Sequence, residues 1–168
     1  MSLLPEDYHA IRNLYGVYAT AIDSGDIDAA MSTFAPHAIV VYEGLPVGLD
    51  RNGRHSGLEA IRALTKDVAD GTAGHVMHLE LPQTIDGDGD EAHVRLYAQI
   101  FRRGQAPFAG TILTDVAEDT LVKVDGSWLV TLRVGHMDSE NAVPASTDVL
   151  VNARDRFVEA GAQAGSPD

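Results

Sequence analysis

Apolar residues recur at three- and four-residue spacings in the first part of the chain, a pattern typical of helices that pack on one face. The clearest stripe lies within residues 6–23 and consists of Ile11, Leu14, Tyr15, Tyr18 and Ile22. A shorter helix is expected over residues 27–34, and a third over residues 58–70 with Ser56 as its N-cap. The sequence therefore predicts three N-terminal helices.

The pattern then changes to the runs and alternations of strands. Residues 86–90, DGDGD, predict a hairpin turn because Asp-Gly steps tolerate positive φ. Residues 44–56 are rich in Gly and predict a loop over the body of the fold. The predicted strands cover residues 38–44, 75–85, 91–103, 108–124 and 128–137, and a C-terminal helical segment is expected within residues 144–162.

This order of elements predicts the α+β class, with three N-terminal helices packed on a strongly curved, mostly antiparallel sheet. We expect one domain over residues 1–168, with its core in residues 8–140 and the C-terminal segment outside or over a pocket. A curved sheet that faces a long helix leaves a natural cavity between them. The fold class thus indicates where a site should lie.

Composition limits the partners. The formal net charge is −13 in 168 residues, which argues against nucleic acid and anionic membrane surfaces, since both attract basic proteins. The absence of cysteine excludes disulfides and a thiolate nucleophile and favours a cytoplasmic location. No membrane-spanning run, phosphate-binding motif or closely spaced set of metal ligands is visible. We therefore expect no cofactor, no metal, no nucleic acid and no membrane, and a small hydrophobic molecule as the partner.

Two positions raise chemical questions. Asp23 ends the first helix, where the macrodipole favours a cation, so it is either a turn residue or a functional acid. On the strand that follows the third helix, alternation places Val76, His78 and Glu80 on one face. The opposite face, with His75, is more apolar and is the one expected to be buried. Both His75 and His78 remain possible bases.

Four stretches resemble a known family: YATAIDSGDIDAAMSTFAPHAIVVYEG, GLEAIRAL, a histidine before IDGDGDEA, and EDTLVKVDGSW. They are similar to the SnoaL-like family of the nuclear-transport-factor cone fold, over roughly residues 8–137. Its members include ketosteroid isomerases, scytalone dehydratase, a hexachlorocyclohexane dehydrochlorinase, limonene epoxide hydrolase, polyketide cyclases and the small subunits of ring-hydroxylating dioxygenases. The resemblance implies a cone-shaped domain that commonly forms a homodimer through the outer face of its sheet.

The resemblance also implies roles for single residues. Asp23 and His78 match the Asp-His pair of the dehydratase and the dehydrochlorinase, in which the carboxylate orients the imidazole as a base. Tyr18 and Asp119 match the tyrosine and the protonated aspartic acid of the isomerase oxyanion site. Tyr42 matches a tyrosine of scytalone dehydratase, but it also stands where the isomerase has its base. The second histidine of scytalone dehydratase aligns near Arg102.

The resemblance thus implies a cofactor-free acid-base enzyme, a dehydratase or other lyase, an isomerase or a cyclase, acting on a small hydrophobic carbonyl or hydroxylated ring compound. The expected catalytic residues are Asp23, His78, Tyr18, Tyr42 and Asp119. The expected pocket lining includes Tyr15, Val76, Tyr97, Phe101 and Leu113. Because each catalytic set is incomplete, a non-catalytic binding or assembly module, such as a dioxygenase-type small subunit, is the alternative.

Overall fold

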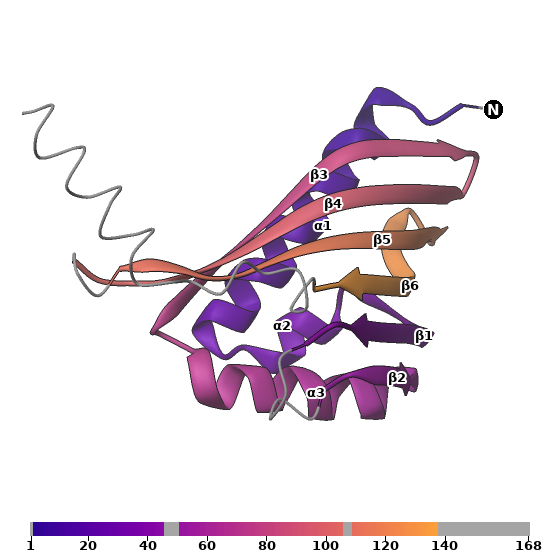
Figure 1. Ribbon diagram of the computed structural model, residues 1–168. Coiled ribbons are helices and arrows are strands. Elements are labelled where there is room, and N and C mark those ends of the chain that lie inside the picture. Colours follow the sequence, from indigo (N-terminus) through magenta and orange to yellow (C-terminus); the bar gives the residue numbers. More distant parts are fainter. Residues whose placement is uncertain (1, 46–50, 106–108, 138–168) are drawn as a thin grey trace, which may run out of the picture. The chain divides into compact units, whose positions relative to one another are not determined.

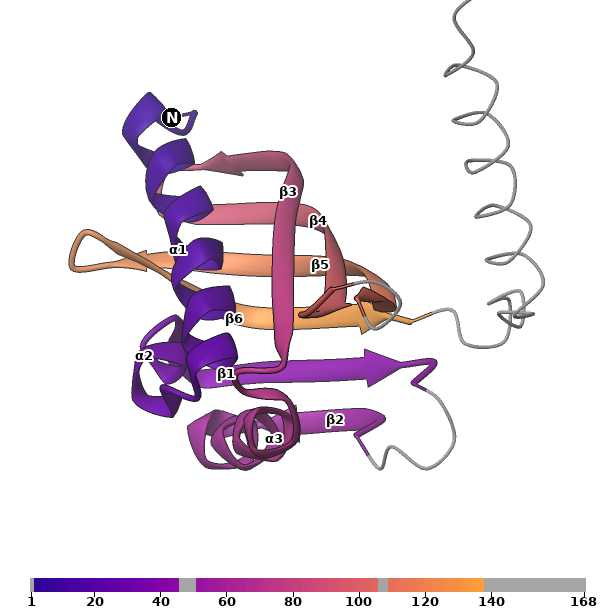
Figure 2. The same ribbon diagram turned by 90° about the vertical axis from the view of Figure 1, so that its left-hand side faces the viewer.

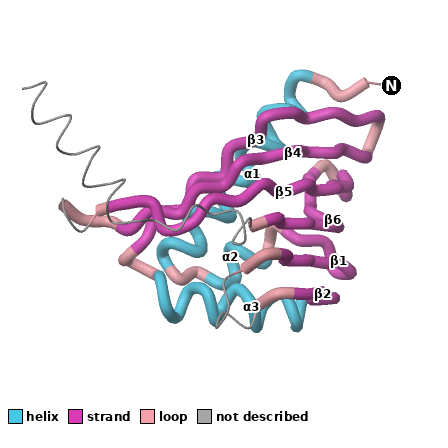
Figure 3. Tube along the Cα trace, in the orientation of Figure 1, coloured by secondary structure: helices cyan, strands magenta, loops and turns pink. Residues whose placement is uncertain are grey.

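The structure, a computed structural model, describes residues 2–45, 51–105 and 109–137. Within these ranges two helices are followed by two strands, a third helix and four long strands, close to the order that the sequence predicts (Figures 1 and 3). The helices are α1 (Pro5–Ser24), α2 (Ile27–Met31) and α3 (Gly57–Thr72). The strands are β1 (Phe34–Glu43), β2 (Gly53–Ser56), β3 (Val76–Asp88), β4 (Glu91–Arg102), β5 (Gly110–Val124) and β6 (Ser127–His136). None of the described helices is long and apolar enough to cross a membrane. The C-terminal segment predicted within residues 144–162 lies outside the described residues.

Asp7 fixes the start of α1 to the hairpin formed by β5 and β6. Its Oδ2 atom accepts the backbone N–H of Leu4, and its Oδ1 atom accepts hydrogen bonds from Lys123 and Trp128. The hydrogen bond from Lys123, followed by those from Leu4 and Trp128, lowers the pKa of Asp7 to about 2. One carboxylate therefore caps the helix and joins it to the far end of the sheet.

A glycine with positive φ and an acidic N-cap residue form the turn between α1 and α2. Gly25 adopts a φ of 77° after the last turn of α1, and Asp26 caps α2 by accepting the backbone N–H of Ala29. Ser56 occupies the N-cap position of α3, but its hydroxyl instead accepts a hydrogen bond from Nε of Arg54. Ser56 is thus the N-cap residue, as the sequence predicts, but its side chain makes no capping hydrogen bond.

The six strands form one mixed sheet in the order β2-β1-β6-β5-β4-β3. Neighbouring strands are antiparallel except β1 and β6, which are parallel. The α+β class is thus confirmed, and the short edge strand β2 lies in the segment predicted as a loop. The sheet is open and not strongly curled, in contrast to the strongly curved sheet expected from the sequence. Register shifts bend individual strands locally without closing the sheet.

A β-bulge decides which side chains of β6 point inward. The partners of Val130 and Leu132 on β5 are adjacent residues, so Thr131 is an extra residue in the ladder. Its hydroxyl donates to the backbone oxygen of Thr120 at 3.0 Å. Because one extra residue shifts the alternation of faces, Arg133 lies on the buried side of the sheet instead of the outer side.

The three helices lie on one face of the sheet (Figures 1 and 2), and the core fills the space between them. Its largest fully buried side chains are Tyr15, Ile11, Ile61, Leu96, Leu121, Val40 and Val130. On β3, the face with His78 and Glu80 is the inner one, whereas Met77 and Leu81 are 43% and 44% exposed. His75 precedes the strand and is exposed. The expectation that the more apolar face of this strand is buried is therefore wrong.

Candidate functional site

Asp23 and His78 are in direct contact. The Oδ1 atom of Asp23 lies 2.6 Å from Nδ1 of His78, and the backbone N–H of His78 donates to both carboxylate oxygens at 3.0 and 3.2 Å. The backbone N–H of Gly74 donates to the carbonyl oxygen of Asp23 at 2.9 Å, which holds the start of β3 against the end of α1. The helix terminus and the strand thus position the two side chains together.

This contact sets the proton on the imidazole. A carboxylate only accepts hydrogen bonds, so Nδ1 of His78 carries a proton, and in the neutral imidazole Nε2 is the nitrogen with the free lone pair. The side chains of His78 and Asp23 are 8% and 19% exposed. The two N–H donors from His78 also compensate a carboxylate at a helix C-terminus, where the macrodipole disfavours it. The position of this acid in the sequence is thereby explained.

His78 lines a cavity of about 90 Å³ between the helices and the inner face of the sheet. This volume exceeds by several times the roughly 10–15 Å³ that one water molecule needs. The apolar lining residues are Ile22, Leu45, Val68, Ala98, Ile100, Leu113, Ala117 and Met137. The polar lining residues are Tyr18, Tyr42, Arg51, His78, Glu80, Asp115 and Arg133. The predicted residues Tyr18, Tyr42, His78 and Leu113 therefore share one cavity.

Arg133 is the buried cation of this cavity. Its Nε and Nη2 atoms donate to both oxygens of Asp119 at 2.8–3.1 Å, and Nη2 also donates to Oε2 of Glu80 at 3.3 Å. The guanidinium carbon lies 4.8 Å from the ring centroid of Tyr18 and 5.7 Å from that of Tyr15. These contacts hold the guanidinium in a fixed position in the cavity wall.

Carboxyl groups outnumber cations around Arg133. Asp119, Glu80 and Asp115 face one guanidinium, and Asp119 is the most completely bound of the three. Burial raises the pKa of Glu80, although the charge of Arg133 lowers it, and burial likewise raises the pKa of Asp115. The cavity wall therefore favours one ion pair, between Arg133 and Asp119, and a neighbouring carboxyl group in its neutral form.

Three residues of the cavity wall have polar atoms without a hydrogen-bond partner among the described residues. Among the described side chains, Oδ1 of Asp115 is the one buried polar atom without a hydrogen-bond partner. Nε2 of His78 and Oε1 of Glu80 also make no hydrogen bond with the described residues. Both residues line the cavity. A base and a carboxyl group thus border the same space.

Tyr18 and Tyr42 add two phenol groups. Burial raises the pKa of both hydroxyls, and each hydroxyl also affects the pKa of the other. Tyr42 packs closely on Gly135, where a Cβ atom would lie only 2.8 Å from its ring and 3.0 Å from Asp115 Oδ2. Both phenols therefore stay protonated near neutral pH and act as hydrogen-bond donors.

A family profile described as a SnoaL-like domain matches residues 5–134. The chain belongs to the SnoaL-like family. Among curated proteins, no sequence matches it.

Solved structures resemble this SnoaL-like protein in fold. A protein of unknown function with a cystatin-like fold from Nostoc punctiforme is 22% identical, with a TM-score of 0.71 over 86% of this chain and 98% of its own. A candidate aromatic ring hydroxylase from Novosphingobium aromaticivorans is 25% identical, with a TM-score of 0.63 over 80% and 91% of the two chains. A candidate scytalone dehydratase from the same organism is 22% identical, with a TM-score of 0.62 over 79% and 84%.

The structure of this SnoaL-like protein places two predicted residues behind the cavity wall. Asp119 is buried and accepts hydrogen bonds from Arg133 and from the hydroxyl of Tyr15, at 2.9 Å in the latter case. It is therefore an acceptor in an ion pair, in contrast to the proton-donating role expected for it. Tyr15, expected in the lining, is fully buried, and its hydroxyl donates a hydrogen bond to Asp119.

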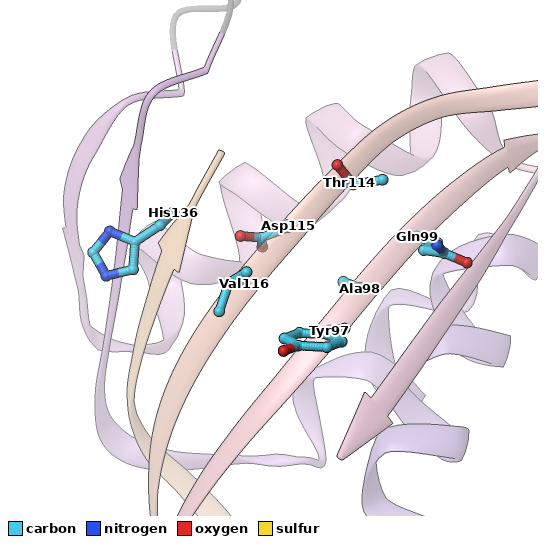
Figure 4. A pocket seen from close by; sticks show the side chains of 7 residues that line it. All are labelled: Tyr97, Ala98, Gln99, Thr114, Asp115, Val116 and His136. Carbon is cyan, nitrogen blue, oxygen red and sulfur yellow. The ribbon is translucent and has the colours of Figure 1, made fainter. Parts of the chain in front are cut away.

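Three other predicted lining residues are also outside the cavity. Tyr97 is 48% exposed on the outer face of the sheet, where it lines a surface depression of about 250 Å³ (Figure 4). Val76 is buried but does not line the cavity, and Phe101 is absent from the lining, in which its neighbour Ile100 takes part. Tyr97 faces outward because side chains alternate along β4 and its neighbour Ala98 faces inward.

Sequence reasoning missed Arg133, Glu80 and Asp115 as site residues. The bulge at Thr131 reverses the face of Arg133, and a bulge of this kind has no clear sequence signature. Glu80 was visible as the residue that shares a face with His78, at the spacing of two that joins side chains on a strand. Within the described ranges, no group of three or more His, Asp or Glu side chains is placed to hold a metal ion.

Proposed function

We propose that this SnoaL-like protein is an acid-base enzyme that removes a proton from carbon in a small hydrophobic carbonyl compound. The contact between Asp23 and His78 beside the cavity is the observation that carries the proposal. Nε2 of His78 is the base, and Asp23 is its positioning partner, which stabilises the imidazolium that forms. Elimination, isomerisation and cyclisation all begin with this step.

The same cavity supplies groups for the substrate oxygen. Removal of a proton next to a carbonyl group places negative charge on the oxygen, and preorganised donors lower the energy of that charge. Tyr18, Tyr42 and the guanidinium of Arg133 line the cavity on other elements than His78. We assign the donation to these three groups. Asp119 supports it indirectly by holding Arg133.

Exchange of carbon-bound hydrogen for deuterium tests this step without knowledge of the natural substrate. Cyclohexanone and α-tetralone are incubated in deuterated buffer, and loss of the proton signals next to the carbonyl group is followed by NMR. The wild type should accelerate the exchange, and His78→Gln should reduce the acceleration about 100-fold or more. Asp23→Asn should reduce it less, because the base remains but its tautomer is no longer fixed.

His75→Gln is the matched control, because His75 lies three residues away and is exposed. This variant should exchange the ketones at the wild-type rate. Equal rates for His78→Gln and the wild type would contradict the proposal. So would a loss of exchange in His75→Gln, since it would place the base outside the cavity.

A non-catalytic assembly module is the second candidate, and the outer face of the sheet favours it. Met77, Leu81, Tyr97 and Ile112 are 43–51% exposed on β3, β4 and β5. Apolar side chains that gather on one surface are typical of interaction sites. Full stability of the purified chain together with ketone exchange would favour the enzyme. A requirement for a second, different chain, without exchange, would favour the module.

A further inference from the structure

We propose that Glu80 is the proton donor that completes an acid-base pair with His78, so that the substrate carries a hydroxyl leaving group. This inference rests on the proposed function and adds a second catalytic residue to it. Glu80 and His78 are both inward-facing residues of β3, and both line the cavity. Residues two apart on a strand lie about 6.6 Å apart. That separation fits a base and an acid acting on neighbouring carbon atoms of one small substrate.

The two oxygens of Glu80 have different surroundings. Oε2 accepts a hydrogen bond from Nη2 of Arg133 at 3.3 Å, which anchors the carboxyl group. Oε1 accepts none from the described residues, and Glu80 lines the cavity. A carboxylic acid held in this way can present its O–H group to a ligand. The side chain is 7% exposed, so a bound substrate would replace most of its contact with water.

The surroundings favour a protonated Glu80. The facing groups are His78 on the same strand, Arg133 on β6, Asp119 and Asp115 on β5, Tyr18 on α1 and Tyr42 on β1. Burial raises the pKa of Glu80, and the charges of Asp119 and Asp115 raise it further, against the charge of Arg133. Asp119 takes the closer hydrogen bonds of Arg133, at 2.8–3.1 Å. The positive charge of the guanidinium therefore stabilises the carboxylate of Asp119 more than that of Glu80.

His78 and Glu80 are coupled in the direction that the reaction needs. Positive charge on His78 lowers the pKa of Glu80. When Nε2 accepts a proton from the substrate, the carboxyl group thus becomes a stronger acid at the same moment. When the surroundings of two titratable groups push their pKa values apart, one group can act as the base and the other as the acid.

The chemical step balances as a loss of water. The C–H bond next to the carbonyl group breaks, its proton moves to Nε2 of His78, and its electron pair forms the new C=C bond. The neighbouring C–O bond breaks, and the departing hydroxyl takes the proton of Glu80 and leaves as water. The proton on His78 then returns to the carboxylate of Glu80 through this water, which restores both groups.

Two probes with different leaving groups test the role of Glu80. They are a butanone with a hydroxyl group on the carbon β to the carbonyl, and the same ketone with a para-nitrophenoxy group in that position. Nitrophenolate leaves without protonation, whereas hydroxide does not. Glu80→Gln should lower the elimination rate of the hydroxy ketone about 100-fold or more and that of the nitrophenoxy ketone less than about threefold.

Glu118→Gln is the matched control, because Glu118 lies on β5 and is exposed. It should leave both rates unchanged. Equal losses with the two probes in Glu80→Gln, or no loss with either, would overturn the role of Glu80. If the wild type exchanges the protons of ketones but eliminates neither leaving group, the inference fails while the proposed function stands; if it does neither, the proposed function fails as well.

Infrared spectroscopy separates these two failures. The difference spectrum between the wild type and Glu80→Gln near neutral pH should contain the C=O band of a protonated carboxylic acid, which the spectrum of Glu118→Gln should not. A carboxylate band in its place would overturn the inference even if the wild type removes protons from ketones.

Discussion

Removing the buried cation Arg133 should destabilise the fold more than removing any exposed arginine. In Arg133→Met the stem still packs, but Asp119, whose side chain is fully buried, loses its hydrogen bonds from the guanidinium. Breaking a buried ion pair by removing one partner typically costs about 3–5 kcal/mol, because the remaining charge is left without compensation.

The option of binding a proton, which any unpaired buried carboxylate has, sets an independent ceiling on this cost. A buried carboxylate that has lost its partner can escape by binding a proton, which costs about 1.4 kcal/mol for each pH unit above its ordinary pKa of about 3.9. That ceiling is about 4 kcal/mol near pH 7 and about 1.5 kcal/mol near pH 5. The loss of stability in Arg133→Met should therefore shrink by more than half between these two pH values.

Urea denaturation followed by the fluorescence of Trp128, which is the single tryptophan, measures this effect. Arg95→Met is the control, because its ion pair with Glu118 spans 3.6 Å between side chains that are 55% and 61% exposed. Such a pair contributes about 0–1 kcal/mol. A loss in Arg133→Met no larger than in Arg95→Met, or a loss that is equal at both pH values, would refute the reasoning.

Three further predictions concern stability and assembly. Glu80→Gln should gain stability relative to the wild type as the pH rises above about 4.5, since the raised pKa of Glu80 makes its ionisation unfavourable to the fold; a pH-independent difference in urea midpoints would contradict this. Gly135→Ala should cost about 1–3 kcal/mol through overpacking against Tyr42 and Asp115, whereas Gly110→Ala, with open space at its Cβ, should be nearly neutral. Sedimentation should detect a homodimer that Tyr97→Glu, on the outer face, weakens; a wild-type monomer at micromolar concentration would contradict this.

The order of elements could be predicted from the sequence because each one has a strong local signal. Residues 6–23 carry a helical stripe, and Gly25 with Asp26 supplies the turn and the cap that follow. The α+β class follows from that order. The curvature of the sheet could not be predicted in the same way. It depends on bulges and on the pairing of edge strands, which have no comparable local signal in the sequence.

The partnership of Asp23 and His78 was predictable only through the family resemblance. Within the strand, the more apolar side chains lie on the face opposite His78, and alternation alone therefore predicts the wrong inner face. The polar residues of β3 can face inward because their partners, Asp23 and Arg133, come from α1 and β6. Because these partners come from segments that are distant in the sequence, the alternation pattern of β3 alone cannot reveal them.

The tautomer of His78 tests the central claim most directly. Two-dimensional NMR that correlates the ring nitrogens and carbon-bound protons of ¹⁵N-labelled protein identifies which nitrogen carries the proton, with His78→Gln to assign the signals. We predict that neutral His78 holds its proton on Nδ1 and leaves Nε2 unprotonated, and that Asp23→Asn abolishes this preference. A proton on Nε2 in the wild type, or a tautomer that Asp23→Asn leaves unchanged, would contradict the account.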